Sequence, residues 1–390
     1  MSTMNTTNPW KGLDFYKESE VLYGRDVEIE SLFDYIRHNT QVVLYGRSGI
    51  GKSSIINAGI FPKVRVEGWI PVPIKLSHDN RMSYVDQIRE AIHRNHVDMY
   101  EVVPAISDKE SLWEFFHRHQ FFDSQGVRVN LLIVFDQFEE IFTLQPIENV
   151  RLEFFAEMAD LFNDTTPRSI VEARKATPRK RQESENGQFD RSRENEIDID
   201  IDFNQADDNR TFEKDYLSES CAHFLFAIRE DFLSYLERYT AHIPVMRNNR
   251  FSLLPLNEEQ AAEIIMKPYP GLVSTEVAKM IIAKVTGTTQ FELDNVPELE
   301  VDSAVLSLYL SRLFEEMVST QATSFTKQLV EHAGSDIIRR FYKEGIAPLS
   351  LDKQERLEYL LLTGDNRRDN ISRSDFLAEG FTNEDVEYLV

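Results

Sequence analysis

The sequence predicts an α/β protein with a parallel sheet that is covered by helices on both faces and followed by a helical second half. Short apolar segments alternate with amphipathic helical patterns over the first 256 residues, as is typical of a parallel sheet. The expected strands are 41–45, 70–76, 131–135 and 223–228, and the expected helices are 26–38, 52–59, 82–95, 111–122 and 150–162. From about residue 257 strand signals nearly vanish, and helical patterns continue at 257–266, 275–286, 302–319 and 326–343.

The most specific motif joins the first expected strand to the helix that follows it. Residues 46–53 form a complete G-x-x-x-x-G-K-[ST] sequence, the P-loop or Walker A motif. Its glycines let backbone N–H groups surround a triphosphate, the lysine supplies a positive charge, and the final hydroxyl is placed to bind Mg²⁺. The helix that starts here is expected to stop at Gly59 and Pro62. The candidate phosphate-binding residues are Gly46, Arg47, Ser48, Gly49, Ile50, Gly51, Lys52, Ser53 and Ser54.

A second acidic element fits the same chemistry. Five apolar residues, 131–135, are followed by Asp136, which has the form of the Mg²⁺-binding carboxylate (Walker B) at the end of a buried strand. Gln137 follows where many hydrolysing P-loop ATPases carry the glutamate that activates water, and a glutamine cannot accept the proton. Either Glu139 or Glu140 supplies the base, or hydrolysis is slow; we expect slow turnover.

The strand at 223–228 ends in Arg229. An arginine at this place is a candidate for sensing the γ-phosphate or for stabilising the charge that develops on it. The alternative is a surface ion pair of Arg229 with Glu230 or Asp231.

Composition excludes several classes of protein. A single cysteine excludes a disulfide framework and a cysteine-rich zinc site, and no apolar run reaches the length of a membrane span. There is no signal-peptide pattern, so we expect a cytoplasmic protein without a membrane partner. The formal net charge of −23 argues against a nucleic-acid partner for this region.

Residues 163–219 interrupt the α/β order and are rich in Pro, Asn, Asp, Arg and Ser. This composition predicts a flexible surface insertion. The alternation of Ile and Asp at 197–203 leaves open a strand that pairs with a partner, and the basic cluster 179–181 is expected to be a solvated loop.

Together these motifs resemble the novel STAND NTPases, bacterial relatives of the NACHT and NB-ARC ATPases. The resemblance is carried by residues 8–13, by 21–25, by the P-loop, by the D-Q-F-E-E segment at 136–140, by 228–233 and by 253–256. It implies an ASCE-type P-loop NTPase core, a helical lid domain and a winged-helix-like domain. The expected division is 1–25 as an adenine-side segment, 26–256 as the core, 257–345 as the lid and 346–390 as the winged-helix-like part.

The resemblance also implies a function. Such proteins are switches that bind ATP or ADP with Mg²⁺, oligomerise on activation, and in many bacteria link a protein trigger to an effector in anti-phage defence. By matching motifs, Tyr23, Gly24 and Arg25 would border the adenine, Ser53 and Asp136 would hold the metal, and Arg229 would be the sensor arginine. Ser303 stands where related lids carry a proline that packs on the adenine. The motifs begin near the N-terminus and the chain ends in the last small domain, which suggests a shortened chain or a separate effector subunit.

Two other functions compete with this one. An AAA-type DNA-associated ATPase would also combine a P-loop core with a winged helix, although Glu384, Asp385 and Glu387 oppose the few basic residues of the C-terminal part. A nucleotide-stabilised scaffold without turnover is the third alternative.

Overall fold

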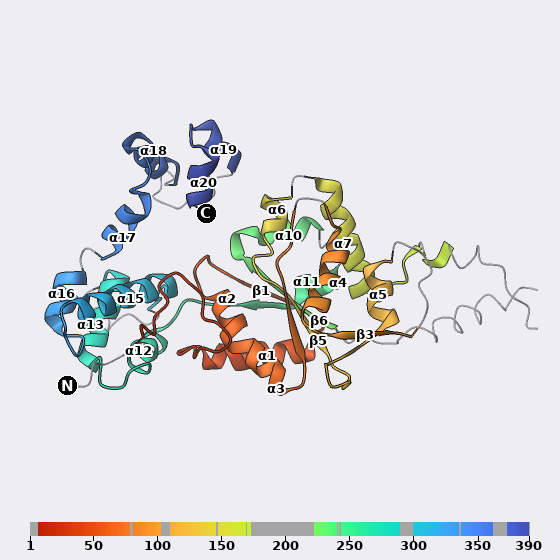
Figure 1. Ribbon diagram of the computed structural model, residues 1–390, viewed down its shortest axis with the longest axis horizontal. Helices are drawn as coiled ribbons and strands as arrows, with labels where there is room; N and C mark the ends of the chain where they lie inside the picture. The colour runs from red at the N-terminus through yellow and green to blue at the C-terminus, as the bar shows by residue number, and fades with distance from the viewer. Residues whose placement is uncertain are drawn as a thin grey trace, which may run out of the picture. The chain divides into compact units, whose positions relative to one another are not determined.

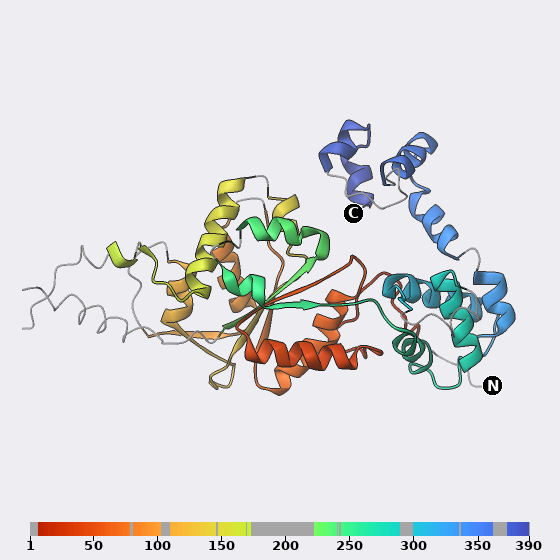
Figure 2. The ribbon, with the colours of Figure 1, turned by 180° about the vertical axis from the view of Figure 1, so that it is seen from behind.

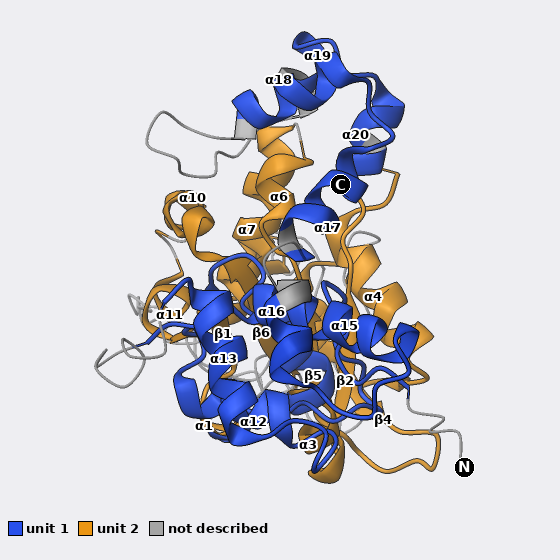
Figure 3. Cartoon of the chain, turned by 90° about the vertical axis from the view of Figure 1, so that its left-hand side faces the viewer, with its two compact units in different colours: residues 1–30, 46–59, 253–390 blue, residues 31–45, 60–252 orange. Residues whose placement is uncertain are grey.

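The computed structural model describes residues 7–78, 81–102, 110–145, 147–168, 170–172, 222–239, 241, 243–288, 299–334, 337–361 and 373–389. The chain forms two compact units, which Figure 3 colours separately. Unit 1 comprises residues 1–30, 46–59 and 253–390, and unit 2 comprises 31–45 and 60–252. Most of the expected insertion, including the 179–181 cluster and the 197–203 alternation, lies outside the described residues.

Unit 2 is built on a five-stranded parallel sheet with the order β2-β5-β6-β1-β7, which confirms the predicted fold class. Its strands are β1 (Gln41–Gly46), β2 (Ile70–Ile74), β5 (Leu131–Phe135), β6 (Ala222–Arg229) and β7 (Arg250–Ser252). The register pairs Val72 with Ile133 and Ile133 with Phe224. Because all five strands run the same way, their carboxyl ends share one edge of the sheet.

Helices cover both faces of this sheet, so its central strands are apolar on both sides. Figures 1 and 2 show α3 (Phe61–Val66) on one face and α4 (Tyr84–Arg94) and α7 (Glu148–Phe162) on the other. Every residue of β5 is buried. Phe135 of β5 stacks on Phe226 of β6 with 5.1 Å between ring centroids, at the centre of an aromatic-rich core.

The described helices and strands follow the expected order, with two corrections. The helix expected at 111–122 is α5 (Leu112–Arg118), and His119–Phe122 is instead strand β4, which pairs antiparallel with β3 (Asp98–Glu101). The helix at 52–59 does not stop at Gly59 and Pro62. It continues as α2 (Lys52–Ser54), a π-helical segment (Ile55–Ile60) and α3, because Pro62 lies in the first turn of α3, where its missing N–H costs nothing.

Short helices complete the two units. Unit 2 also contains α6 (Glu140–Thr143), a 3-10 turn (Glu230–Phe232), α10 (Leu233–Tyr239) and α11 (Pro244–Asn248), and α1 (Asp26–His38) begins in unit 1. Unit 1 contains α12 (Glu258–Met266), α13 (Thr275–Thr286), α15 (Ser303–Ser319), α16 (Lys327–Gly334), α17 (Ile337–Ile346), α18 (Leu351–Leu361), α19 (Arg373–Ala378) and α20 (Asn383–Leu389). Among the described residues, none of the helices is both long and apolar enough to pass through a membrane.

The helices α12, α13, α15 and α16 pack around their own apolar core, which also takes in the N-terminal segment. Trp10 is 2% exposed, packs against Phe314 and Phe325, and donates its indole N–H to the carbonyl of Ile264 at 3.0 Å. The predicted capping box at the start of α12 is present, with Asn257 and Gln260 bonded reciprocally. We call α12 to α16 together the lid helices.

Candidate functional site

The P-loop, residues 46–54, requires glycine at two positions for two different reasons. Gly51 is the residue before α2 and has a φ of 98°, and a Cβ added there would meet nothing within 4 Å, so its requirement is purely conformational. At Gly46 the requirement is space, because an added Cβ would lie 2.7 Å from the carbonyl oxygen of Leu253. The loop therefore turns as the motif predicts, between β1 and α2.

Two side chains of the loop, Lys52 and Ser54, form hydrogen bonds with other described residues, and a third, Ser53, does not. Lys52 Nζ donates to the carbonyl oxygens of Gly46 at 2.9 Å and Arg47 at 3.0 Å, so its ammonium lies within the turn. Ser54 Oγ accepts the N–H of Tyr16 at 3.2 Å and is a supporting residue. The hydroxyl of Ser53 makes no hydrogen bond to any described residue and is available to a ligand.

Arg25 contacts the P-loop directly through a hydrogen bond to its backbone. Its side chain is 4% exposed, and its guanidinium donates to Glu28 Oε1 at 2.8 Å and to the carbonyl of Ile50 at 3.2 Å. Burial lowers the pKa of Arg25, and the Glu28 carboxylate opposes that shift. The expected adenine-side role of Arg25 remains a prediction, whereas its contact with the P-loop is direct.

Glu28 connects this contact to the lid helices. The same Oε1 that accepts from Arg25 also accepts from Gln260 Nε2 at 2.7 Å, while Glu28 Oε2 is buried without a hydrogen-bond partner. Gly24, with a φ of 71°, makes room for this approach, because an added Cβ would lie 2.6 Å from the carbonyl oxygen of Gln260. We call Arg25, Glu28 and Gln260 the carboxylate relay.

The lid helices reach the P-loop at a second place. Ser303, the first residue of α15, donates its hydroxyl to the carbonyl of Gly49 at 3.1 Å. Ala304 is so close that a Cβ on Gly49 would lie 3.0 Å from its methyl group. Arg47 pairs with Glu300 at 3.2 Å, although both side chains are 61% exposed. The serine in place of the family's proline thus forms a polar contact with the loop.

Asp136 and its successors follow β5 in unit 2. Asp136 Oδ1 accepts the N–H of Gln137 at 3.0 Å. Gln137 has a φ of 57°, a left-handed conformation that is uncommon for a residue with a side chain. Strain of this kind is frequent at functional sites and turns the chain sharply away from the end of the strand.

The two candidate glutamates have different surroundings. Glu139 Oε2 accepts the backbone N–H of Arg229 at 3.3 Å, which ties it to the end of β6. Burial raises the pKa of Glu140, with a smaller contribution in the same direction from Asp136, and Lys75 opposes both. A raised pKa makes a carboxylate a better proton acceptor, which suits Glu140 to the role of a base.

Arg229 lies at the carboxyl end of β6 and forms the ion pair that was the alternative expectation. Its guanidinium donates to both carboxylate oxygens of Asp231, at 3.1 and 2.6 Å, and lies over the Phe232 ring at 5.4 Å from the centroid. A sensor role for Arg229 would therefore require that it leave Asp231.

His78, which the sequence interpretation did not select, lines a small cavity together with Asp136 and Glu140. Tyr84 Oη accepts from Gln145 Nε2 at 3.1 Å and lies 2.8 Å from His78 Nδ1, and the arrangement in which the hydroxyl donates to Nδ1 places the ring proton on Nε2. That Nε2 is buried without a partner, and burial lowers the pKa of His78, which keeps the ring neutral. His78, Asp136 and Glu140 line one cavity of about 10 Å³, room for about one water.

The donor set suits Mg²⁺ by its chemistry. A carboxylate at Asp136 and a hydroxyl at Ser53 are the hard oxygen ligands that this ion prefers, and Mg²⁺ in such sites keeps several waters and binds the phosphates of the nucleotide. The metal assignment to these two residues remains a prediction.

Comparison with known structures gives weak likenesses. The ORC2 protein of Aeropyrum pernix in its ADPNP–ADP complexes is 13% identical, with 96% of this chain and 88% of that chain covered and a TM-score of 0.44. CDC6P of Pyrobaculum aerophilum is 11% identical, with 93% and 86% covered and a TM-score of 0.44. A Walker-type ATPase of Pyrococcus abyssi is 11% identical, with 97% and 93% covered and a TM-score of 0.38. Scores this low do not transfer a function or a partner.

Family comparison is more informative. Among curated proteins no sequence matches the chain. Residues 9–186 match the family model described as Novel STAND NTPase 1, a segment that contains the P-loop and Asp136 and confirms the resemblance. This segment, which is less than half of the chain, is similar to the novel STAND family of P-loop NTPases.

Proposed function

We propose that the chain is an ATP-binding switch of the STAND type, which hydrolyses ATP slowly and changes conformation and oligomerises when ADP is exchanged for ATP. Its partners would be further copies of itself, a protein trigger and an effector, in cytoplasmic anti-phage defence. The proposed division is an adenine-side segment at 1–25, the NTPase core at 26–256, the lid at 257–345 and a winged-helix-like part at 346–390.

One observation carries the proposal: the lid helices are hydrogen-bonded to the P-loop within unit 1. Ser303 bonds the carbonyl of Gly49, and Gln260 reaches the carbonyl of Ile50 through Glu28 and Arg25. Because the lid helices bond to the backbone of the P-loop, the equilibrium between lid positions would depend on what the loop binds. Such linkage is the requirement for a nucleotide-dependent switch.

Each residue of the site has a role in this proposal. The loop N–H groups and Lys52 would bind the phosphates, and Ser53 and Asp136 would hold Mg²⁺, which neutralises phosphate charge when bound. Glu140 would accept the proton of the attacking water. Because Gln137 cannot accept a proton and Arg229 is bonded to Asp231, we expect turnover to be slow.

Single-turnover hydrolysis and light scattering test the proposal together. We expect wild type to form ADP slowly and to increase in mass with ATP but not with ADP, and Glu140→Gln to keep the ATP-dependent increase without hydrolysis. Lys52→Ala should lose both responses, with Lys63→Ala, a lysine outside the motif, as its control. Equal mass with ATP and ADP would reject the switch, and hydrolysis by Glu140→Gln at the wild-type rate would reject Glu140 as the base. Absence of product in wild type would favour the scaffold.

A further inference from the structure

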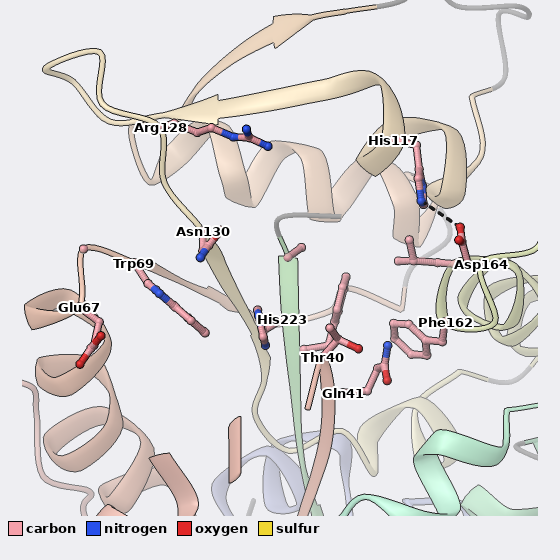
Figure 4. Close-up of a pocket in the computed structure, with 14 residues that line it drawn as sticks. Thr40, Gln41, Glu67, Trp69, His117, Arg128, Asn130, Phe162, Asp164 and His223 are labelled. Atoms are coloured by element: carbon pink, nitrogen blue, oxygen red, sulfur yellow. Dashed lines mark ion pairs between the residues drawn. The ribbon is translucent and has the colours of Figure 1, made fainter. Parts of the chain in front are cut away.

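Unit 2 contains a cavity of about 740 Å³ that the nucleotide site does not use. It opens at the amino ends of the strands, where Gln41 begins β1, Trp69 precedes β2, Asn130 precedes β5 and His223 belongs to the start of β6 (Figure 4). The P-loop and Asp136 follow the carboxyl ends of β1 and β5. A five-residue strand is roughly 16 Å long, so this cavity is separate from the nucleotide edge of the sheet.

Aromatic rings form two walls of the cavity. Trp69 and His223 pack with 4.4 Å between centroids and 36° between planes, and Figure 4 shows them on one side of β6 and Phe162 on the other. Phe162 is held in place by an edge-to-face contact with Phe224 at 5.1 Å. Faces of this kind favour a planar ring as the occupant.

The polar groups on the walls are both donors and acceptors. His223 Nδ1 faces the carbonyl oxygens of Ile36 at 3.0 Å and Asn39 at 3.2 Å, so the ring proton lies on Nδ1. Burial lowers the pKa of His223 and keeps the ring neutral, which leaves Nε2 as an acceptor.

Gln41 and Asn130 complete the polar lining. Gln41 is 7% exposed, yet its amide makes no hydrogen bond to any described residue, and the same holds for the Asn130 amide. Neither amide is among the buried side-chain groups that lack a partner, so both are accessible from the cavity.

The charged residues that line the cavity limit the kind of ligand it can bind. Glu67, Asp164 and Arg128 also line the cavity, and Asp164 is bound to His117 Nε2 at 3.1 Å. Two carboxylates and one guanidinium give no excess of positive charge for a polyphosphate, whereas an uncharged ring with donors and acceptors along its edge can pair with an amide and the imidazole. Amide side chains pair with the edges of nucleobases in this way.

We propose that this cavity is a second ligand site that binds a nucleobase or nucleoside. The ring would stack against the Trp69–His223 wall, and its edge would pair with Asn130, which Figure 4 shows on the same side of β6. The site would require no phosphate, in contrast to the P-loop.

The test uses the full chain saturated with ADP, so that the P-loop site is occupied, and the probes adenosine, guanosine, cytidine and uridine in calorimetric titrations. We expect at least one nucleoside to bind with a Kd below about 1 mM. Trp69→Ala should weaken that binding about 5- to 150-fold, as expected for loss of one base–aromatic stack. Asn130→Ala should also weaken it, and Trp69→Phe should retain most of it.

Tyr359→Ala, which removes an aromatic side chain that is 83% exposed, is the matched control and should not change the affinity. Circular dichroism of each variant shows that it is folded. The proposal is overturned if no probe binds, if the Trp69→Ala and Asn130→Ala variants bind as strongly as wild type, or if binding is seen only without ADP and therefore belongs to the P-loop. None of these outcomes affects the proposed switch.

Discussion

The substitution Glu28→Ala tests whether the carboxylate relay supports the P-loop. Arg25 and Glu28 form a pair in which the side chains are only 4% and 19% exposed. Removal of one partner of a buried ion pair costs about 3–5 kcal/mol, because the other charge is left without compensation. Since Glu28 retains some exposure and Arg25 keeps the Ile50 carbonyl, we expect the lower end, about 3 kcal/mol.

Urea unfolding followed by circular dichroism measures this loss. With a slope of about 2 kcal/mol per molar urea, the midpoint should fall by roughly 1.5 M. The matched control is Glu263→Ala, which removes the same charge from a pair with Lys267 whose side chains are 46% and 40% exposed. That control should lose no more than about 0.5 kcal/mol. A Glu28→Ala midpoint equal to that of the control would refute the reasoning.

The relay also predicts a functional consequence for the lid. Gln260→Ala removes both the Glu28 contact and the capping box of α12, whereas Asn257→Ala removes only the cap. If the relay links the lid to the loop, ADP affinity should fall about tenfold in Gln260→Ala, a loss of about 1.4 kcal/mol, and should change little in Asn257→Ala. Equal losses in both variants would mean that the helix cap alone matters.

Three further predictions concern the site itself. Gly51→Ala should cost about 1–2 kcal/mol of backbone strain and abolish nucleotide binding, whereas Gly68→Ala, also left-handed with open space around it, should cost as much stability and leave binding intact. Glu140→Gln should raise the unfolding midpoint at neutral pH, because burial penalises the ionised carboxylate; the gain over wild type should vanish as the pH falls through the raised pKa. His78→Phe should lower the single-turnover rate about tenfold or more without loss of nucleotide affinity, as expected if its Nε2–H orients a water beside the carboxylates; an unchanged rate would exclude that role.

The sheet and the P-loop could be predicted from the sequence because their signals are local. Five consecutive apolar residues at 131–135 identify a strand buried on both faces, and the glycine spacing of the loop is set by its own backbone. The capping box at Asn257 could be predicted equally well, since both of its partners lie within one helical turn. In each case the interaction that fixes the structure spans only a few residues.

Other features depend on residues far apart in the chain. The segment 111–122 has phenylalanines at helical spacing, and only its pairing with β3 makes His119–Phe122 a strand. The role of Gln260 depends on Glu28, 232 residues away, and the orientation of His78 depends on Gln145 through Tyr84. No local pattern carries these contacts, so the sequence alone could not predict the carboxylate relay, the hydrogen bonding of His78 or the cavity at the amino ends of the strands.

The geometry of the peptide group explains how the lid contacts bear on phosphate binding. A peptide unit is planar, so the direction of one carbonyl fixes the opposite direction of the next N–H. Ser303 holds the carbonyl of Gly49 and Arg25 holds that of Ile50, and these two peptide units present the N–H groups of Ile50 and Gly51. The Ile50 N–H makes only a long bond, 3.4 Å, to Arg47, so it remains open to a stronger acceptor. Each lid contact therefore favours one orientation of an N–H that a phosphate would use. By the reciprocity of linked equilibria, a phosphate that selects those orientations must favour the same lid contacts.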